Sequence, residues 1–205
     1  MSIEQIKVGF DNFSYIIYDL INKESAIVDP SININKQVDF LKAKKLDLKY
    51  IINTHHHSDH TSKNVKLKKF YPKAKITVSK AHMNSLNVNP EALVSQDSEL
   101  KIGSITLKFL LTPGHTPDGL CIIVDNKAIL TGDTLFIDNC GRADLPGGNI
   151  NDLFNSLQKI KQLSDDIVVY PGHDYGPKLF DRLGNQKKTN KTLLAKNIDE
   201  FSKIP

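Results

Sequence analysis

The chain has 205 residues, of which 40% are hydrophobic and 24% charged, a composition that argues against a disordered or fibrous protein and suffices for a sizeable buried core. It holds no run of about eighteen apolar residues, and its N-terminal segment lacks a basic start followed by an apolar stretch, so we expect neither a transmembrane helix nor a signal peptide. The lysines behind the net charge of +4 accompany no nucleic-acid-binding motif. We therefore expect one domain over residues 1–205 that binds neither nucleic acid nor a membrane.

The cysteines and lysines carry weaker information. Cys121 and Cys140 are too few for a disulfide framework, which favours a reduced, cytoplasmic setting. The scattered lysines form either solvated helix faces or a positive rim that attracts an anionic substrate.

In the first half of the chain, strands and helices alternate. Apolar residues over 13–20 and 25–30 predict two adjacent strands, and those over 34–45 have helical spacing. Residues 48–54 read as a buried strand. A helix is expected over 61–70, with Thr61 as its N-cap, followed by a strand over 75–80.

The second half begins with strands alone. Between residues 99 and 136, apolar runs are broken by GS, PGHTPDG and DN, which predicts antiparallel strand pairs. An amphipathic helix over 149–163, a strand over 166–171 and a closing helix over 190–203 follow. This order predicts a layered α/β fold, and no stretch resembles a linker.

Polar residues recur where apolar runs end, beside glycine or proline, as in IVDP, LLTPGHT, AILTGDT and VVYPGH. Four of the seven histidines also fall within the stretch THHHSDH. Loops at strand ends gather at one edge of a sheet, so these side chains are expected to meet there. Imidazole and carboxylate together suit zinc, iron or manganese.

The spacing within THHHSDH assigns ligands to two ions. Alternate side chains of an extended segment point the same way, so His55 and His57 can bind one ion, while Asp59 and His60 face a second. His56 between them points away, and His82 is expected to be structural. The predicted ligands are His55, His57 and His115 for one ion and Asp59, His60 and His173 for the other, with Asp133 bridging them.

The motif T-H-x-H-x-D-H, with the later TPGHT, TGDT and PGH loops, resembles the metallo-β-lactamase fold superfamily from about residue 10 to residue 190. The resemblance implies a four-layer αββα sandwich with the metal site along one edge, and the same seven ligands. It also implies that Asp29 orients a ligand histidine; the other interpretation is an N-cap of the following helix. An aspartate bridge, where the antibiotic-degrading members use cysteine, argues against a β-lactamase.

The stretch TGDTLFIDNCGRADLPGGN (131–149) is similar to the glyoxalase II-like and persulfide dioxygenase-like branches. This likeness implies that Cys140, Arg142, Asp144 and Tyr175 lie near the substrate. Arg142 either contacts a substrate carboxylate or pairs with Asp144. Tyr175 is either a substrate contact or a packing residue, and Cys140 is either a lining residue or an apolar filler.

The sequence departs from the family pattern at four positions. Lys63 and Asp118 stand where relatives usually have glycine, and Gln186 and Lys191 replace a glutamate and a proline. Full-length glyoxalase II enzymes also carry a C-terminal helical region that binds glutathione, for which we expect no room here. The thiol carrier therefore remains open.

Two activities are compatible with these residues. The first is hydrolysis of a thioester, similar to hydroxyacylglutathione hydrolase (glyoxalase II), with two divalent ions, foremost zinc and otherwise iron or manganese, and a metal-bridging hydroxide. There Asp59 would orient the nucleophile and accept its proton, and Asp133 would hold the ions.

The second activity is oxidation of a glutathione-type persulfide by O₂ on a single Fe(II), since two histidines and one carboxylate leave positions on iron open for a thiol and O₂. The resemblance to the persulfide dioxygenases implies that His55, His115 and Asp133 would hold this iron. The LPGGN continuation favours hydrolysis. A closed structural metal site is disfavoured, since the set has no cysteine ligand. The sequence carries no signal for the oligomeric state.

Overall fold

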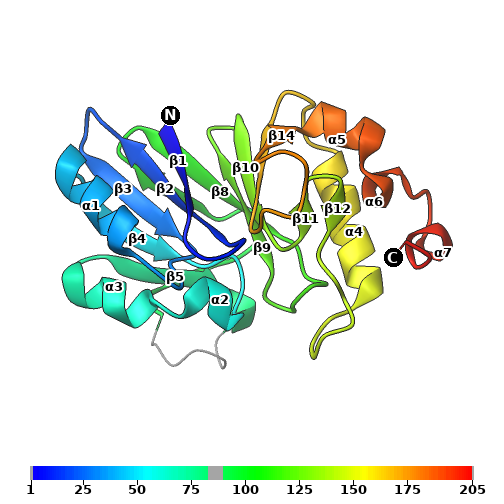
Figure 1. Cartoon of the computed structure of the whole chain (residues 1–205), viewed down its shortest axis with the longest axis horizontal. Coiled ribbons are helices and arrows are strands. Elements are labelled where there is room, and N and C mark those ends of the chain that lie inside the picture. The colour runs from blue at the N-terminus through cyan, green and yellow to red at the C-terminus, as the bar shows by residue number, and fades with distance from the viewer. Residues whose placement is uncertain (1, 83–89, 205) are drawn as a thin grey trace.

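The computed structural model describes residues 2–82 and 90–204. Two six-stranded sheets pack face to face, and helices cover the outer face of each (Figure 1). This is the four-layer αββα arrangement of the α/β class that the sequence predicted. Loops that follow strands of both sheets lie along one edge of this sandwich.

The first sheet runs in chain order. Its strands β1 to β3 are antiparallel, and β3 to β6 are parallel. They are β1 (Ser2–Lys7), β2 (Phe13–Asp19), β3 (Glu24–Val28), β4 (Asp47–Ile52), β5 (Lys75–Ser79) and β6 (Ala92–Val94). The helical segments beside them are α1 (Asn35–Lys44), α2 (Ser58–Thr61), α3 (Asn64–Phe70) and the 3₁₀ helix Lys80–His82.

The second sheet has the order β14-β13-β10-β9-β8-β7, with β10 and β13 parallel. Its strands are β7 (Glu99–Ile102), β8 (Ile105–Leu111), β9 (Leu120–Val124), β10 (Ala128–Gly132), β13 (Val168–Pro171) and β14 (Asp181–Arg182). A small ladder joins β11 (Leu135–Phe136) to β12 (Asn139–Cys140). The helices on this side are α4 (Ile150–Lys161), α5 (Leu183–Thr189), α6 (Lys191–Leu194) and α7 (Ile198–Phe201).

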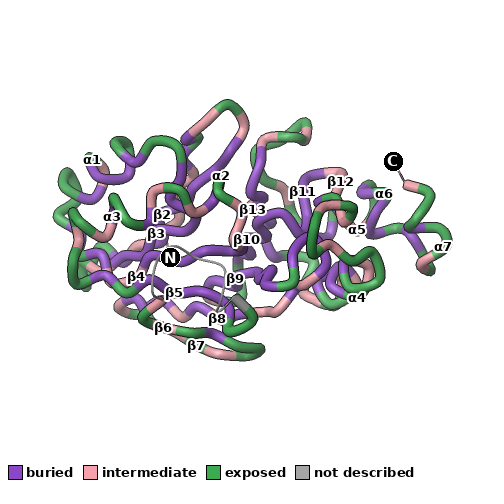
Figure 2. Tube along the Cα trace, turned by 90° about the horizontal axis from the view of Figure 1, so that it is seen from below, coloured by how far each residue is buried: buried purple, intermediate pink, exposed green. Residues whose placement is uncertain are grey.

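The buried core consists of three apolar layers, visible as the buried interior in Figure 2. Successive residues of a strand point to opposite faces, so in β2 Ile17 packs between the sheets while Ile16 packs under α1. Because both faces are covered, central strands such as β9 are buried along their whole length. That explains why the sequence shows continuous apolar runs there.

Two helix predictions are wrong. Thr61 is not an N-cap but the last residue of α2, since its hydroxyl donates backward to the His57 carbonyl at 3.1 Å, and the next helix begins at Asn64. Residues 190–203 form two short helices instead of one, because Asn197 has an extended backbone (φ −151°) and caps α7 through its side chain.

Two further expectations concern the membrane and the cysteines. In the described part of the chain, no helix is both long and apolar enough to span a bilayer. Cys121 and Cys140 are both free thiols, as expected for a chain without a disulfide framework.

Asp19 ties the β2–β3 turn to the β7–β8 turn. Its Oδ2 accepts hydrogen bonds from the Ser104 amide and hydroxyl, both at 2.8 Å, and its Oδ1 accepts from the Ile21 amide at 2.9 Å. These bonds, with the Ser104 amide foremost, hold the pKa of Asp19 below its usual range. The charged carboxylate therefore stabilises the folded state.

We predict that Asp19→Asn lowers the midpoint of thermal unfolding at pH 7, and that the difference from wild type shrinks as the pH falls below about 4. The pKa is lower in the folded state, so the stabilisation is present above the unfolded-state pKa and is lost on acidification. Scanning calorimetry between pH 7 and pH 2.5 measures this, with Asp39→Asn on exposed α1 as the control. A difference that does not change with pH would contradict the prediction.

Candidate metal centre

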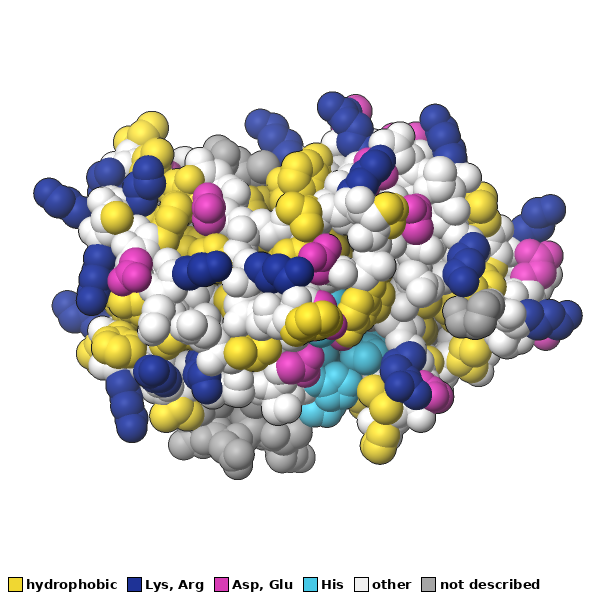
Figure 3. Space-filling model, in the orientation of Figure 1, with side chains coloured by type: hydrophobic (Ala, Val, Ile, Leu, Met, Phe, Trp, Pro, Cys, Tyr) yellow, Lys and Arg dark blue, Asp and Glu magenta, His cyan; other side chains and the backbone are white. Residues whose placement is uncertain are grey.

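The seven predicted ligands come from four loops that meet at one edge of the sandwich. The loop after β4 and helix α2 carry four of them, and the loops after β8, β10 and β13 carry one each. Histidine side chains reach the surface there, next to acidic and hydrophobic side chains (Figure 3). The structure therefore brings the predicted residues together: His55, His57, Asp59, His60, His115, Asp133 and His173.

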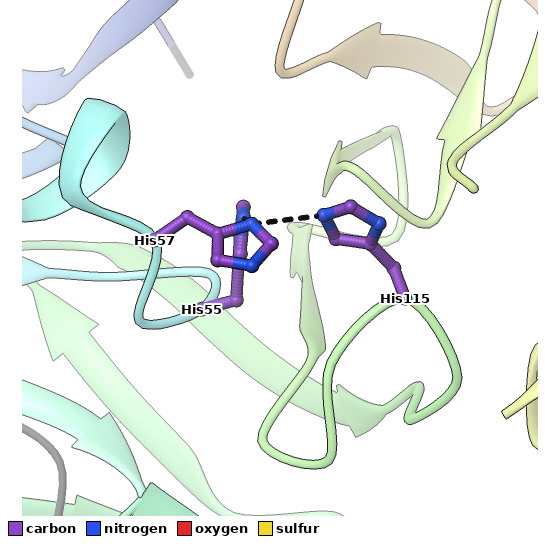
Figure 4. Close-up of side chains that lie close together, drawn as sticks. All are labelled: His55, His57 and His115. Atoms are coloured by element: carbon purple, nitrogen blue, oxygen red, sulfur yellow. Dashed lines mark hydrogen bonds between the residues drawn. The ribbon is translucent and has the colours of Figure 1, made fainter. Parts of the chain in front are cut away.

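The first set is a triad of imidazoles. His57 Nδ1 lies 3.1 Å from His55 Nε2 and 3.1 Å from His115 Nε2. In Figure 4 a dashed line joins the rings of His57 and His115, which come from opposite sides. Two nitrogens bound to one tetrahedral zinc at about 2.0–2.1 Å would lie about 3.3 Å apart. The observed spacing is close to that value, so the triad fits a single ion.

The second set lies on the other side of the same cavity. His60 Nε2 and His173 Nε2 are 3.2 Å apart, and Asp59 Oδ2 lies 3.6 Å and 3.5 Å from them, respectively. The three side chains form the second group predicted from the sequence.

Asp133 lies between the two sets. Its Oδ2 is 3.5 Å from His115 Nε2 and 3.3 Å from His173 Nε2, and its Oδ1 is 3.3 Å from His60 Nε2. Oδ1 is buried and has no hydrogen-bond partner among the described residues. A buried carboxylate oxygen without a donor is costly, and a bound cation would remove that cost.

Outer hydrogen bonds fix the orientation of the ligand rings. His60 Nδ1 donates to Asp29 Oδ2 at 3.0 Å, and His115 Nδ1 donates to the Arg142 carbonyl at 2.7 Å. Each bond places the proton on Nδ1 and leaves the lone pair of Nε2 facing the cavity. The Thr54 hydroxyl, 3.1 Å from His55 Nδ1, donates to Asp29 Oδ2 at 2.7 Å and is thus oriented to accept from His55.

Asp29 is therefore placed where a residue that orients a ligand histidine is expected, and not as a helix cap. Its backbone has φ +53°, and α1 begins six residues later without a side-chain cap. Its Oδ1 also accepts the Thr54 amide at 2.8 Å.

Sequence reasoning missed two residues that hold the second set, Asp11 and Asn12. Asn12 Nδ2 donates to Asp59 Oδ2 at 3.0 Å, and Asp11 Oδ1 lies 3.4 Å from His173 Nδ1. Both precede β2, which runs antiparallel to β3, so the start of β2 lies at the same edge as the end of β3. The sequence signal for the ligands was a polar residue directly after an apolar run. A polar residue directly before an apolar run, as here, would have identified Asp11 and Asn12.

Burial and charge divide the histidines into two kinds. Burial lowers the pKa of His55 and His57, which keeps them neutral and ready to bind a cation. Burial also opposes protonation of His60 and His173. The nearby carboxylates, Asp133 foremost, outweigh burial: they raise the pKa of His60 to about 9 and also raise the pKa of His173. Burial alone would raise the pKa of Asp133, yet the nearby imidazoles hold it well below its usual range. The second set thus attracts positive charge.

Two glycines let the backbone approach these ligands closely. Gly132 has φ +48°, which turns the chain at the end of β10 toward Asp133. A Cβ on Gly172 would collide with Asp133 Oδ1. Gly172 of PGH therefore makes room for the carboxylate, while Gly132 of TGDT supplies the turn and leaves room for Thr54.

The cavity at this site has a volume of about 550 Å³ and is lined by five of the seven candidate ligands, together with the expected substrate-side residues Cys140, Arg142 and Tyr175. 

His55 and His60 are buried and do not line the cavity. The five ligands that line it are His57, Asp59, His115, Asp133 and His173. Tyr175 stacks on His173, with ring centroids 4.7 Å apart, and is 58% exposed. Burial and the nearby carboxylates raise the pKa of Tyr175 to about 12, so its hydroxyl stays a hydrogen-bond donor.

The Arg142–Asp144 ion pair, one of the two interpretations of Arg142, is present. Arg142 Nε and Nη2 donate to the two oxygens of Asp144, each at 2.6 Å. Cys140 is half-buried beside this pair, and burial raises the pKa of its thiol to about 11. It therefore remains a neutral thiol at physiological pH.

The departures from the family pattern at Lys63 and Asp118 are accommodated locally. Lys63 has φ −111°, an ordinary conformation that does not require glycine. Asp118 Oδ1 lies 2.7 Å from His56 Nδ1 and so joins the His115 loop to the loop after β4. His56 points away from the ligands, as predicted, and the side chain of His82 lies outside the described residues.

Comparisons with known proteins identify the family. A model of the metallo-β-lactamase superfamily matches residues 8–173. The chain belongs to the metallo-β-lactamase superfamily.

Three relatives illustrate the range of likeness. The chain is 34% identical to "Probable polyketide biosynthesis zinc-dependent hydrolase PksB" of Bacillus subtilis strain 168, over 82% of this chain and 75% of that protein. It is 33% identical to a hydroxyacylglutathione hydrolase of Pelagibacter ubique, over 98% of this chain and 83% of that one. The crystal structure of ETHE1 from Myxococcus xanthus superimposes with a TM-score of 0.88 at 26% identity, covering 100% and 92% of the two chains.

We predict that Asp29→Asn weakens metal binding about 10- to 100-fold, because the amide cannot accept the His60 Nδ1 proton as the carboxylate does. Asparagine tolerates the left-handed backbone at this position. Chelator competition on the folded protein measures the affinity. The matched control is Asp97→Asn, an exposed aspartate with φ +60°; equal affinities in the two variants would refute the prediction.

Proposed function

We propose that the protein is a metal-dependent hydrolase that cleaves thioesters, similar in reaction to glyoxalase II. The observation that carries the proposal is the pair of complete ligand sets joined by Asp133, since hydrolysis by two ions requires both. Relatives named as hydrolases support it.

The donor set fits two divalent ions. It combines imidazole nitrogens with carboxylate oxygens and includes no thiolate, which suits zinc, with iron or manganese as alternatives. Bound ions would lower the pKa of a water molecule to about 7 and polarise the thioester carbonyl.

Asp59 and Asp133 have different tasks in this proposal. The Asp59 side chain is 45% exposed and lines the cavity, where the Asn12 amide holds its Oδ2. It can therefore orient the nucleophile and accept its proton. Asp133 is buried and keeps the two ligand sets together.

The leaving group needs little assistance. A thiolate of pKa about 8.5 leaves readily at neutral pH, so a general acid is not required. Cys140, kept as a thiol by burial, is poorly suited to be a nucleophile or a metal ligand.

Persulfide oxidation on one iron is the second candidate. His115 Nε2 lies 3.5 Å from Asp133 Oδ2, and His55 groups with Asp133, so two histidines and one carboxylate are close enough to hold Fe(II). Because the persulfide dioxygenases keep the residues of the second set too, that set does not separate the two reactions. We favour hydrolysis because of the LPGGN continuation and the relatives named as hydrolases.

Two assays on metal-reconstituted protein separate these functions. We expect the zinc form to cleave S-lactoylglutathione or S-acetyl-N-acetylcysteamine, and the release of free thiol measures this cleavage. We expect the iron(II) form to consume no oxygen when given glutathione persulfide. Rapid oxygen uptake by the iron form alone, without thioester cleavage, would replace the hydrolase proposal by the dioxygenase.

We predict that Asp59→Asn lowers kcat for thioester cleavage by about 10²–10⁴-fold, because the amide cannot accept a proton. Steady-state kinetics, with metal content measured on the same samples, separates this loss from loss of an ion. Asp47→Asn, at the opposite end of β4, is the control. A variant with full metal content and wild-type kcat would remove Asp59 from the mechanism.

A further inference from the structure

A second cavity, of about 860 Å³, adjoins the metal cavity. The two cavities share four lining residues, Asn139, Cys140, Gly141 and Arg142. These residues belong to β12 and the turn after it, so a single short segment borders both cavities. The two cavities are therefore neighbours at this segment.

Arg142 is the one lysine or arginine among the described residues that line either cavity. Its guanidinium is already bound by both oxygens of Asp144, at 2.6 Å each. The same contact lowers the pKa of Asp144 to about 2, so the carboxylate stays charged at physiological pH. The border between the cavities therefore offers a substrate no net positive charge.

The rest of the second cavity is uncharged. Its apolar lining includes Ala143, Ile150, Leu153, Phe201 and Ile204. Its polar lining includes the side chains of asparagine and threonine, namely Asn139, Asn149, Asn151 and Thr192. Such a surface suits a neutral ligand chain that carries amide and methyl groups. The ligand's amides can hydrogen-bond to the asparagines, and its methyl groups can contact the apolar residues.

We propose that the second cavity binds the uncharged, amide-bearing arm of a pantetheine-type thiol, with the thioester at the end of that arm in the metal cavity. This inference rests on the proposed thioester hydrolysis. Glutathione fits less well, because its two carboxylates would meet a border whose one arginine is already paired. Charges that lose water without gaining a partner weaken binding.

The first test compares thioesters of one acyl group on the wild-type zinc form. S-Acetylpantetheine is expected to exceed S-acetylglutathione in kcat/KM by at least about tenfold; the reverse order would overturn the inference. Cleavage of the truncated S-acetyl-N-acetylcysteamine reports hydrolysis itself. If none of the three is cleaved, the proposed function fails; if only the preference is absent, the cavity assignment alone fails.

The second test fills the cavity. Ile150, at the start of α4, is 38% exposed and lines the second cavity but not the metal cavity. Ile150→Trp is expected to raise KM for S-acetylpantetheine at least about tenfold, and to leave both kcat and the KM for the truncated thioester unchanged. Leu194→Trp, an exposed helical position outside both cavities, is the control. Equal changes for the long and short thioesters would overturn the assignment.

The third test releases the arginine. Asp144→Asn frees Arg142 for a substrate carboxylate, so the KM for S-acetylglutathione is expected to fall relative to that for S-acetylpantetheine. An unchanged ratio would contradict the argument from charge.

Acetyl-coenzyme A, run in parallel, identifies the source of the arm. Cleavage as fast as that of S-acetylpantetheine indicates a free coenzyme, and slow cleavage indicates an arm held by a carrier protein. Both results retain the cavity assignment.

Discussion

The buried carboxylate of Asp133 is the constraint on which the site depends. It lies within 3.5 Å of nitrogens from three histidines, and burial makes its charge costly unless positive charge is near. His60 and His173, whose pKa values the carboxylates raise, supply part of that charge by binding protons, and a divalent ion in either set would supply more. Asp29, Asp11 and Asn12 then act from outside, each holding a ligand in the orientation that the buried carboxylate requires.

The strands explain why such a cluster forms at all. The ligand loops follow β4, β8, β10 and β13, strands from both sheets that end at the same edge of the sandwich. Continuous apolar runs hold these strands in the core, so the packing of the core determines where the polar residues after them lie. The apolar pattern therefore predicted a layered α/β fold and the gathering of the ligands, and the resemblance to the family added the four-layer αββα arrangement.

Features set by contacts across the fold were harder to predict. Asn12 and Asp11 lie more than forty residues from Asp59 and His173. The pairing of β2 with β3 and a bridge between Asn12 and His173 bring them to the site. Threonine is a common N-cap residue, but the Thr61 hydroxyl donates backward to the His57 carbonyl. The break between α6 and α7 depends on the extended backbone of Asn197, which helical spacing does not reveal.

The site separates chemistry from recognition. The candidate ligands sit on loops that follow strands of both sheets, whereas the residues that border both cavities belong to β12 and the turn after it. Asn190 fixes the β11–β12 ladder from α6, since its Nδ2 donates to the carbonyls of Phe136 and Asn139 at 3.2 Å and 3.0 Å. Under the proposed function, a change in the turn, such as loss of the Arg142–Asp144 pair, would alter which thiol is accepted without moving a metal ligand.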